Sequence, residues 1–394
     1  MNKEKRIYGI DALRAIAMIL GIFLHSSIAY KVHTHRNWIH DEQFNSLFFD
    51  FIYSFIHSFR MPVFFVIGGF FCRLLYYKVG IRQFIFHRWK RVGLPFIIAL
   101  IVIVPLSLFP YNLYIYHYKL GLDLKLALDR SMHRLLKFNG LAHLWFLYYL
   151  LLYYAVVLLY MQLKKMSIIN AVAGKIFFWL KNIQINRIHW IIIVCLLVWT
   201  ILLPEKDIFP ITDTYLFPKR IHNLILYGYL FGLGWIFHIR MDIFTLLVRK
   251  FQALLFSGIV ISLFIFYSEW QIDYSYSKAL HLILKALAGC QMVFLTFGFM
   301  GFFLSYFKTE NRFWRYVSDA SYWIYLLHLG IVISMQLILL NSPVPGILRF
   351  PLVFIVALLL TLITYHYCVR YTFIGAALHG VRKRKMKVIP HGEI

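Results

Sequence analysis

Charge is scarce in this sequence of 394 residues. Asp, Glu, Lys and Arg together make up 14% of the chain, and long runs such as 190–203 and 352–369 contain none of them. Hydrophobic residues make up 61% of the chain and aromatic residues 19%, whereas an average soluble domain is roughly half apolar. A water-soluble core could not bury that much apolar surface. The composition therefore excludes a soluble globular domain and indicates that lipid is the solvent.

Cysteine is also rare. The four cysteines lie in or beside hydrophobic runs, and no pair has the spacing of a disulfide framework or a zinc site. The sequence also lacks a Walker-type phosphate loop, a Gly-rich dinucleotide fingerprint and the histidine–carboxylate pattern of a zinc hydrolase. These absences argue against a nucleotide hydrolase or a metal enzyme. We therefore expect no metal and no permanently bound cofactor.

Ten apolar segments are predicted to be membrane-spanning helices, because roughly 20 helical residues cross the core of a bilayer. The fifth and sixth are the shortest. The segments are residues 10–30, 51–75, 92–109, 144–161, 190–203, 222–237, 251–267, 280–303, 316–340 and 352–369. The first is not expected to be a cleaved signal, since Asp11 and Arg14 interrupt it and no small-residue cleavage site follows. The predicted fold class is an all-α, polytopic integral membrane helical bundle.

Basic residues outnumber acidic ones, with 41 Lys and Arg against 16 Asp and Glu and a net charge of +25. If the N-terminus is inside, most of the excess basic residues fall in the inward-facing segments, and the outward-facing segments are nearly balanced. This asymmetry is the positive-inside pattern of membrane proteins. It predicts that both termini are cytoplasmic, as an even number of spans requires. The basic charge is thus explained by the lipid bilayer, and we expect no nucleic acid partner.

The segments between the spans leave no room for a soluble domain. We expect one transmembrane domain over residues 1–375 and a basic cytoplasmic tail over residues 376–394. Residues 111–143 are predicted to form an outward loop with a short amphipathic helix. The basic segment 162–189 should lie along the inner membrane surface. The run 382–387 is predicted to anchor the chain near anionic lipid.

Titratable side chains inside a span cost about 2.5–3.5 kcal/mol each on insertion scales and usually face a bundle interior or a cavity. The first span contains Arg14 and His25. Their spacing places them on one helix face, roughly 16 Å apart along the axis. One interpretation is that Arg14 snorkels to the cytoplasmic surface and His25 bonds a neighbouring helix. The other is that His25 is a general base, because the unperturbed pKa of histidine lies near neutrality.

Asp50, which directly precedes the second span, shares one half of a helix with His57 and Arg60 of that span. These side chains either form part of a functional site or make a structural pairing that neutralises buried charge. Gly68 and Gly69 follow, and small residues of this kind allow helices to approach closely.

A basic loop is expected between the second span and the third. Arg82, Arg88, Lys90 and Arg91 form the densest such cluster between two spans. The cluster is either a positive-inside anchor or a phosphate site, since Arg binds phosphate well.

Two further histidines lie near predicted spans. His143 opens the fourth span, and His328 lies within the ninth at a depth comparable with His25. A lone interfacial histidine is more often structural, but similar depths would allow His25 and His328 to share a cavity.

Five motifs occur in order along the chain: an Arg with His eleven residues later, RMPVFFVIGGFF, RQFIFHRWKRVGLP, HLWFL and SYWIYLLH. Together they resemble the acyltransferase 3 family of membrane acyltransferases over essentially the whole chain. Within that family, the sequence is most similar to members that add succinyl groups to osmoregulated periplasmic glucans. The resemblance implies a multi-pass protein of the bacterial inner membrane. One departure is Gly68, which stands where many members have Ser.

The resemblance also implies a reaction. An acyl-CoA in the cytoplasm, succinyl-CoA or acetyl-CoA, would donate its acyl group to a hydroxyl of a periplasmic glucan or another glycan. His25 is the expected general base, and Arg60 is a candidate for pairing with a succinyl carboxylate, because many acetyl-transferring members have His at this position. The expected donor-binding residues are Arg14, Arg88, Lys90 and Arg91. The expected acyl or acceptor site comprises Asp50, His57, Arg60, His143 and His328.

Other functions remain open at this point. The nearest alternative is O-acetylation of lipopolysaccharide or another surface glycan. A secondary transporter or glycan exporter would also place charges near the midplane, but we find no paired interrupted helices in repeated halves. A structural or sensory component would have no use for costly intramembrane Arg and His residues.

Overall fold

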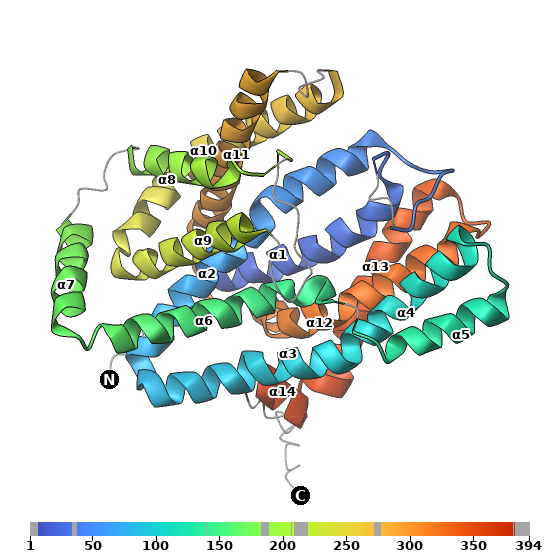
Figure 1. The fold of residues 1–394 in the computed structure, drawn as a ribbon, viewed down its shortest axis with the longest axis horizontal. Coiled ribbons are helices and arrows are strands. Elements are labelled where there is room, and N and C mark those ends of the chain that lie inside the picture. Colours follow the sequence, from blue (N-terminus) through green and yellow to red (C-terminus); the bar gives the residue numbers. More distant parts are fainter. Residues whose placement is uncertain are drawn as a thin grey trace, which may run out of the picture.

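The structure is a computed structural model that describes residues 7–33, 38–138, 140–182, 189–205, 207–208, 220–271, 277–380 and 382 (Figure 1). None of these residues lies in a β-strand. The α-helices are α1 Tyr8–Ser27, α2 Leu47–Arg88, α3 Leu94–Ile98, α4 Val104–Tyr114, α5 Leu124–Leu135, α6 Trp145–Leu163, α7 Ser167–Asn182, α8 His189–Leu202, α9 Ile221–Ile239, α10 Asp242–Gln271, α11 Lys278–Tyr306, α12 Arg312–Leu340, α13 Gly346–Thr364 and α14 Phe373–Leu378.

The expected helical membrane bundle is confirmed. Nine of the ten predicted segments fall within helical stretches of the structure, and the fifth, 190–203, extends one residue beyond the end of α8. Among the described residues, seven stretches are long and apolar enough to cross a membrane: Tyr8–Tyr30, Leu47–Lys119, Ala142–Leu163, Asp242–Glu269, Lys278–Tyr306, Arg312–Leu340 and Gly346–Val369. One of them, Leu47–Lys119, contains two of the predicted spans, and α8 is a shorter apolar helix. The count of ten crossings and the cytoplasmic termini stay predictions.

The structure corrects the region after the second predicted span, which we expected to be a loop. Helical residues continue to Arg88, but the helix is interrupted by a kink at Gly80, where φ is 75° and ψ is 172°. Glycine adopts this backbone conformation without a steric penalty. A π-helical turn, Trp89–Gly93, then leads directly into α3. Helical turns resume directly after Gly80. The basic residues Arg82, Arg88, Lys90 and Arg91 therefore lie on helical turns and not in a loop.

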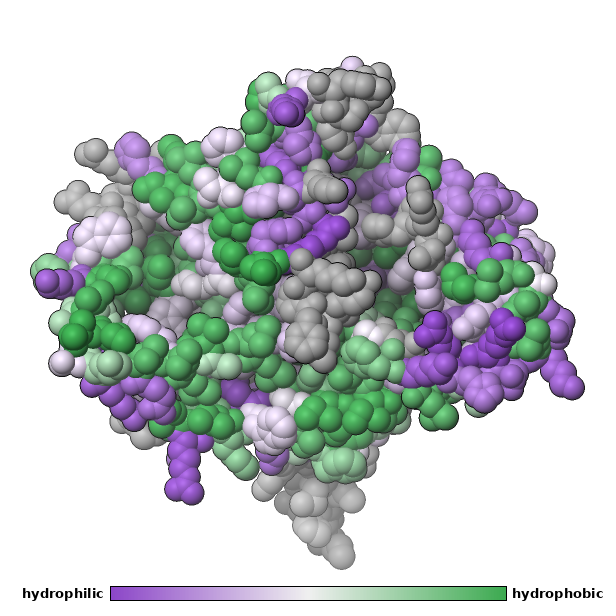
Figure 2. Space-filling model, in the orientation of Figure 1, coloured by the Kyte–Doolittle hydropathy of each residue, from purple (hydrophilic) through white to green (hydrophobic). Residues whose placement is uncertain are grey.

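Three of the described helices, α5, α7 and α14, lie outside the predicted spans. Helix α5 is the amphipathic helix expected within residues 111–143, and the side chain of Asp123 caps it by accepting a hydrogen bond from the Leu126 N–H at 3.1 Å. Helix α7 lies at the left edge of Figure 1, and none of its residues is buried. Figure 2 shows apolar side chains over much of one face and hydrophilic ones gathered on the right, over α5.

Helix α1 is central to the bundle, since it contacts α2, α11, α12 and α13. Its first turns and the last described residue lie at the same end. Arg382 forms an ion pair with Asp319 of α12 at 2.6 Å, and Tyr8 lines a small cavity with Arg315 of the same helix. The rest of the basic run 382–387 lies outside the described residues.

Helices α2 and α9 cross at two glycines, as the pattern at Gly69 led us to expect. A Cβ atom added to Gly69 would lie 1.8 Å from the carbonyl oxygen of Phe231. A Cβ atom added to Gly234 would lie 1.8 Å from the carbonyl oxygen of Val66. Each glycine therefore lies against the backbone of the other helix, and neither has room for a side chain.

Gly234→Ala should destabilise the protein by about 1–3 kcal/mol, because the added methyl group would clash with the backbone of α2 and force the two helices apart. Gly232→Ala is the matched control on the same helix, since nothing lies within 4 Å of its added Cβ. Thermal unfolding in detergent should give a lower midpoint for Gly234→Ala than for Gly232→Ala. Equal midpoints would contradict the close crossing.

Candidate active site

Three histidines from separate parts of the chain line one cavity of about 230 Å³, which we call the histidine pocket. His25 comes from the last turn of α1, His143 from the 3₁₀ turn before α6, and His328 from the middle of α12. The ring centroids of His25 and His328 are 5.2 Å apart, and those of His143 and His328 are 5.6 Å apart. His57 and Arg60 of α2 line the same cavity.

Backbone contacts define the proton positions on two of these rings. His328 Nδ1 lies 2.9 Å from the carbonyl oxygens of Ile324 and Tyr325, and His143 Nε2 lies 3.1 Å from that of Leu326. A carbonyl oxygen only accepts, so each of these nitrogens carries the hydrogen. The opposite nitrogens, His328 Nε2 and His143 Nδ1, are buried and have no hydrogen-bond partner in the described part of the chain. In the neutral rings, both are acceptors.

The end of α1 that carries His25 is held by a buried glutamine. Gln336 Nε2 donates to the carbonyl oxygens of His25 and Ser26, both at 3.1 Å. Its Oε1 accepts a hydrogen bond from Trp38 Nε1 at 3.2 Å, and Trp38 lines the histidine pocket. These carbonyls belong to the last turn of a helix, where intrahelical partners run out. Gln336 therefore fixes the backbone of His25 and attaches the following loop to it.

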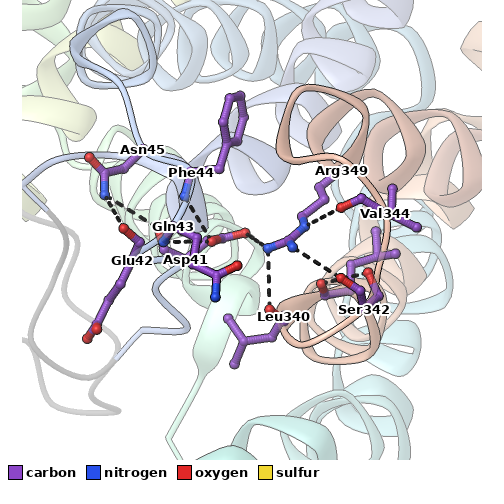
Figure 3. Close-up of polar contacts among 10 residues, drawn as sticks. Asp41, Glu42, Gln43, Phe44, Asn45, Leu340, Ser342, Val344 and Arg349 are labelled. Carbon is purple, nitrogen blue, oxygen red and sulfur yellow. Dashed lines mark hydrogen bonds and ion pairs between the residues drawn. The ribbon is translucent and has the colours of Figure 1, made fainter.

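The same loop is anchored by a buried ion pair, shown in Figure 3. Asp41 Oδ2 lies 2.6 Å from Arg349 Nη1, and both side chains are almost fully buried. Arg349 also donates to the carbonyl oxygens of Val344, Leu340 and Ser342, which satisfies its guanidinium. Breaking a buried pair of this kind leaves an uncompensated charge. The loop between α1 and α2 is thus tied to the turn between α12 and α13.

Arg60 reaches the histidine pocket across a glycine. A Cβ atom on Gly21 would lie 2.2 Å from Arg60 Nη1, so the guanidinium occupies the space that a side chain at position 21 would need. Gly21 is one turn before His25 on α1. Arg60 Nε has no hydrogen-bond partner among the described residues. The pocket therefore brings a buried cation close to the histidines.

A second cavity, of about 350 Å³, lies nearer the start of α1, and we call it the arginine pocket. Arg14, His87, Arg88 and Arg91 line it, and its described lining contains no Asp or Glu. Arg88 is held in place, since its Nη2 donates to the Phe71 carbonyl at 3.1 Å. Such a concentration of guanidinium groups favours a phosphate-bearing ligand.

The two cavities adjoin each other. Met18, Phe64, Phe146 and Tyr325 line both of them. Met18 lies one turn after Arg14 on α1, between that residue and His25. These four side chains therefore lie between the arginine pocket and the histidine pocket, along one face of α1.

Asp50 lies in a third cavity, of about 460 Å³, which we call the outer polar cavity. The Asp50 carboxylate accepts hydrogen bonds from the backbone N–H groups of Val32 and His33 at 2.8 and 3.2 Å, and it lies 3.8 Å from Lys31 Nζ. Lys31 is thus a structural partner for Asp50 that the sequence pattern did not suggest. His57 lines both this cavity and the histidine pocket.

The structure brings together most, but not all, of the residues singled out in the sequence. His25, His57, Arg60, His143 and His328 meet in the histidine pocket, and Arg14, Arg88 and Arg91 meet in the arginine pocket. Lys90 is exposed and lines neither of them. No group of three or more His, Cys, Asp or Glu side chains among the described residues is arranged to hold a metal ion.

Sequence reasoning missed Trp38, Gln336 and Tyr325. Tyr325 lines both pockets, and its hydroxyl donates to the His143 carbonyl at 2.6 Å. One signal was present for Gln336, since an amide within an apolar span is itself costly unless it is hydrogen-bonded.

Comparison with known proteins identifies the family of the chain. Residues 7–366 match the acyltransferase 3 family, described as an acyltransferase domain. Two relatives named glucans biosynthesis protein C, from Escherichia coli strains SMS-3-5 and K12, are 35% and 34% identical over 144 residues. The match covers 36% of this chain and 36% of each relative. No solved structure matches the chain. Since the family match covers nearly all of the sequence, the chain belongs to the acyltransferase 3 family of membrane acyltransferases.

Proposed function

We propose that this protein transfers an acyl group, in the first place succinyl, from acyl-CoA to a hydroxyl of a glucan on the opposite side of the membrane. The observation that carries the proposal is the pair of adjoining cavities, one lined by arginines and the other by histidines. The relatives' name points to glucans as the class of acceptor. The phosphates of CoA bind in the arginine pocket, beside Arg14, Arg88 and Arg91.

The acyl thioester then reaches the histidine pocket past Met18, one of the side chains that line both cavities. A pantetheine arm is about as long as the roughly 16 Å of helix between Arg14 and His25. Two substrates that approach from opposite sides would meet at His25, and holding them in register contributes much of the rate enhancement.

The reaction at His25 is a general-base acyl transfer. The acceptor oxygen attacks the thioester carbonyl carbon while an unprotonated ring nitrogen of His25 takes the hydroxyl proton. The new C–O bond forms, the C–S bond breaks, and the thiolate of CoA leaves and takes up that proton. His143 and His328 each offer an acceptor nitrogen in the same pocket, and these nitrogens accept hydrogen bonds from other hydroxyl groups of the saccharide.

The test is direct. Protein reconstituted in lipid nanodiscs is incubated with labelled succinyl-CoA or acetyl-CoA and a neutral glucan oligosaccharide, and products are examined by mass spectrometry. An oligosaccharide ester and free CoA are expected, with succinyl-CoA preferred. Acetyl ester alone would favour the alternative donor. Movement of unmodified oligosaccharide across proteoliposomes with no ester formed would favour an exporter.

Arg60→Gln should reduce the preference for succinyl over acetyl transfer by about tenfold or more, because a hydrogen bond to a charged group is worth about 1.5–3 kcal/mol. The guanidinium pairs with the free carboxylate of the succinyl group, which an acetyl group lacks. Gly21→Ala is a second variant with the same expected direction, since its methyl group displaces the Arg60 guanidinium. The measurement is the ratio of kcat/KM for the two donors. Unchanged ratios in both variants would remove Arg60 from donor selection.

A further inference from the structure

We propose that the outer polar cavity binds the acceptor and that it selects a neutral, hydroxyl-rich saccharide. The proposal rests on the acyltransferase function proposed above and adds the acceptor site to it. The cavity volume, about 460 Å³, lies within the roughly 300–1,000 Å³ typical of small-molecule sites. Tyr53 and His57 line both this cavity and the histidine pocket. A saccharide bound there has a hydroxyl within reach of the pocket that holds His25.

Three parts of the chain converge at this cavity. Lys31 follows the first span, Asp50 lies in the first turn of α2, and Glu269 lies near the end of α10. Lys31 and Asp50 are each 8% exposed and form its inner wall. Glu269 is exposed and stands at the mouth. The cavity is therefore open at the end of the bundle opposite to the arginine pocket.

The lining suits a sugar. Carboxylates accept hydrogen bonds from hydroxyl groups, and an ammonium or a serine hydroxyl donates them. The rings of Tyr53 and His57 are nearly parallel, with centroids 5.6 Å apart and an angle of 6° between their planes. Ser54 lies beside them in the cavity lining. Together they offer flat apolar surface next to hydrogen-bonding groups, the combination that a pyranose ring requires.

The charge of the cavity selects against an anionic acceptor. Lys31 Nζ is already engaged, 3.8 Å from Asp50 Oδ1 and 4.2 Å from the centre of the Tyr53 ring. Burial lowers the pKa of Lys31, and the neighbouring Asp50 carboxylate opposes that effect. Glu269 adds a second carboxylate at the mouth. When Glu269 is ionised, the two carboxylates outnumber the Lys31 ammonium, and a negatively charged acceptor is repelled, whereas the arginine pocket favours the phosphates of the donor.

The test measures binding of a neutral glucan oligosaccharide by calorimetry, without donor, to the full chain in nanodiscs. Glu269→Gln removes a carboxylate at the mouth, and Ser54→Phe fills the cavity. Both should raise the Kd by about tenfold or more, in line with the loss of a hydrogen bond to a charged group or of the cavity itself. Glu310→Gln is the matched control. Glu310 is an exposed acid that pairs with Arg315. It lies just before the start of α12 and near the start of α1, away from the outer polar cavity. Its Kd should equal that of the wild type.

A carboxylated form of the same oligosaccharide gives a second readout. It should bind the wild type more weakly than the neutral form does, and Glu269→Gln should strengthen its binding while weakening that of the neutral form. Opposite changes of this kind are not expected from a structural defect. Wild-type Kd values in both Glu269→Gln and Ser54→Phe, or no binding of the neutral oligosaccharide to the wild type, would overturn the proposal. Binding that depends on this cavity, without ester formation from any acyl-CoA, would instead reject the proposed function.

Discussion

His25→Ala should lower the rate of acyl transfer by about a hundred- to ten-thousand-fold, the usual contribution of a general base. The ring lines the histidine pocket, where the proposed mechanism brings the thioester and the hydroxyl together. Its removal leaves both substrate sites intact, so the fall should appear in kcat and leave the donor KM nearly unchanged. The measurement is steady-state transfer from succinyl-CoA to a neutral glucan oligosaccharide.

The matched control for His25→Ala is His133→Ala. The side chain of His133 on α5 is 75% exposed, so the variant should keep the wild-type rate. If His25→Ala still esterified the oligosaccharide at near wild-type speed, the base would have to be another group, and His328 would be the next candidate because its Nε2 lies in the same pocket.

Loss of the arginine pocket's positive charge should raise the KM for acyl-CoA. For Arg14→Gln with Arg91→Gln, we expect an increase of about a hundredfold, since each replacement removes a charge-assisted hydrogen bond to phosphate. The value of kcat at saturating donor should stay near that of the wild type, because these residues lie away from the reacting atoms. Donor titrations with labelled succinyl-CoA measure both constants.

Two controls separate phosphate binding from general damage. Lys90→Gln removes a neighbouring charge that is exposed and lines neither pocket, so its donor KM should not change. Succinyl-pantetheine lacks the nucleotide phosphates, so the double variant and the wild type should use it equally well. A double variant that lost activity toward both donors equally would show that the arginines act on the fold.

Patterns within one helix predicted the site best. The eleven-residue interval between Arg14 and His25 predicted a shared face of α1, and the structure lines adjoining cavities with these two side chains, with Met18 between them. The helical class and the approximate limits of the apolar segments also followed from composition, because a span must hide its backbone in a helix of sufficient length.

Contacts between distant helices could not be predicted from the sequence. Gln336 is 311 residues away from His25, the residue whose carbonyl it binds, and no periodicity within either helix reveals their packing. The partner of Asp50 was similarly hidden, since Lys31 lies in the chain between two spans. The bend at Gly80 was missed because a single residue at positive φ turns the helix without the usual cluster of turn-forming residues.

The anchored loop between α1 and α2 has a consequence for how substrates enter. The Asp41–Arg349 pair fixes one part of this loop, and the Trp38–Gln336 hydrogen bond fixes another to the backbone of His25. Because the loop is held at both places, it cannot move away from the bundle without also displacing the end of α1. Substrates are therefore expected to reach the histidines through openings between the helices that need no movement of this loop. The proposed base would then keep its position throughout each turnover.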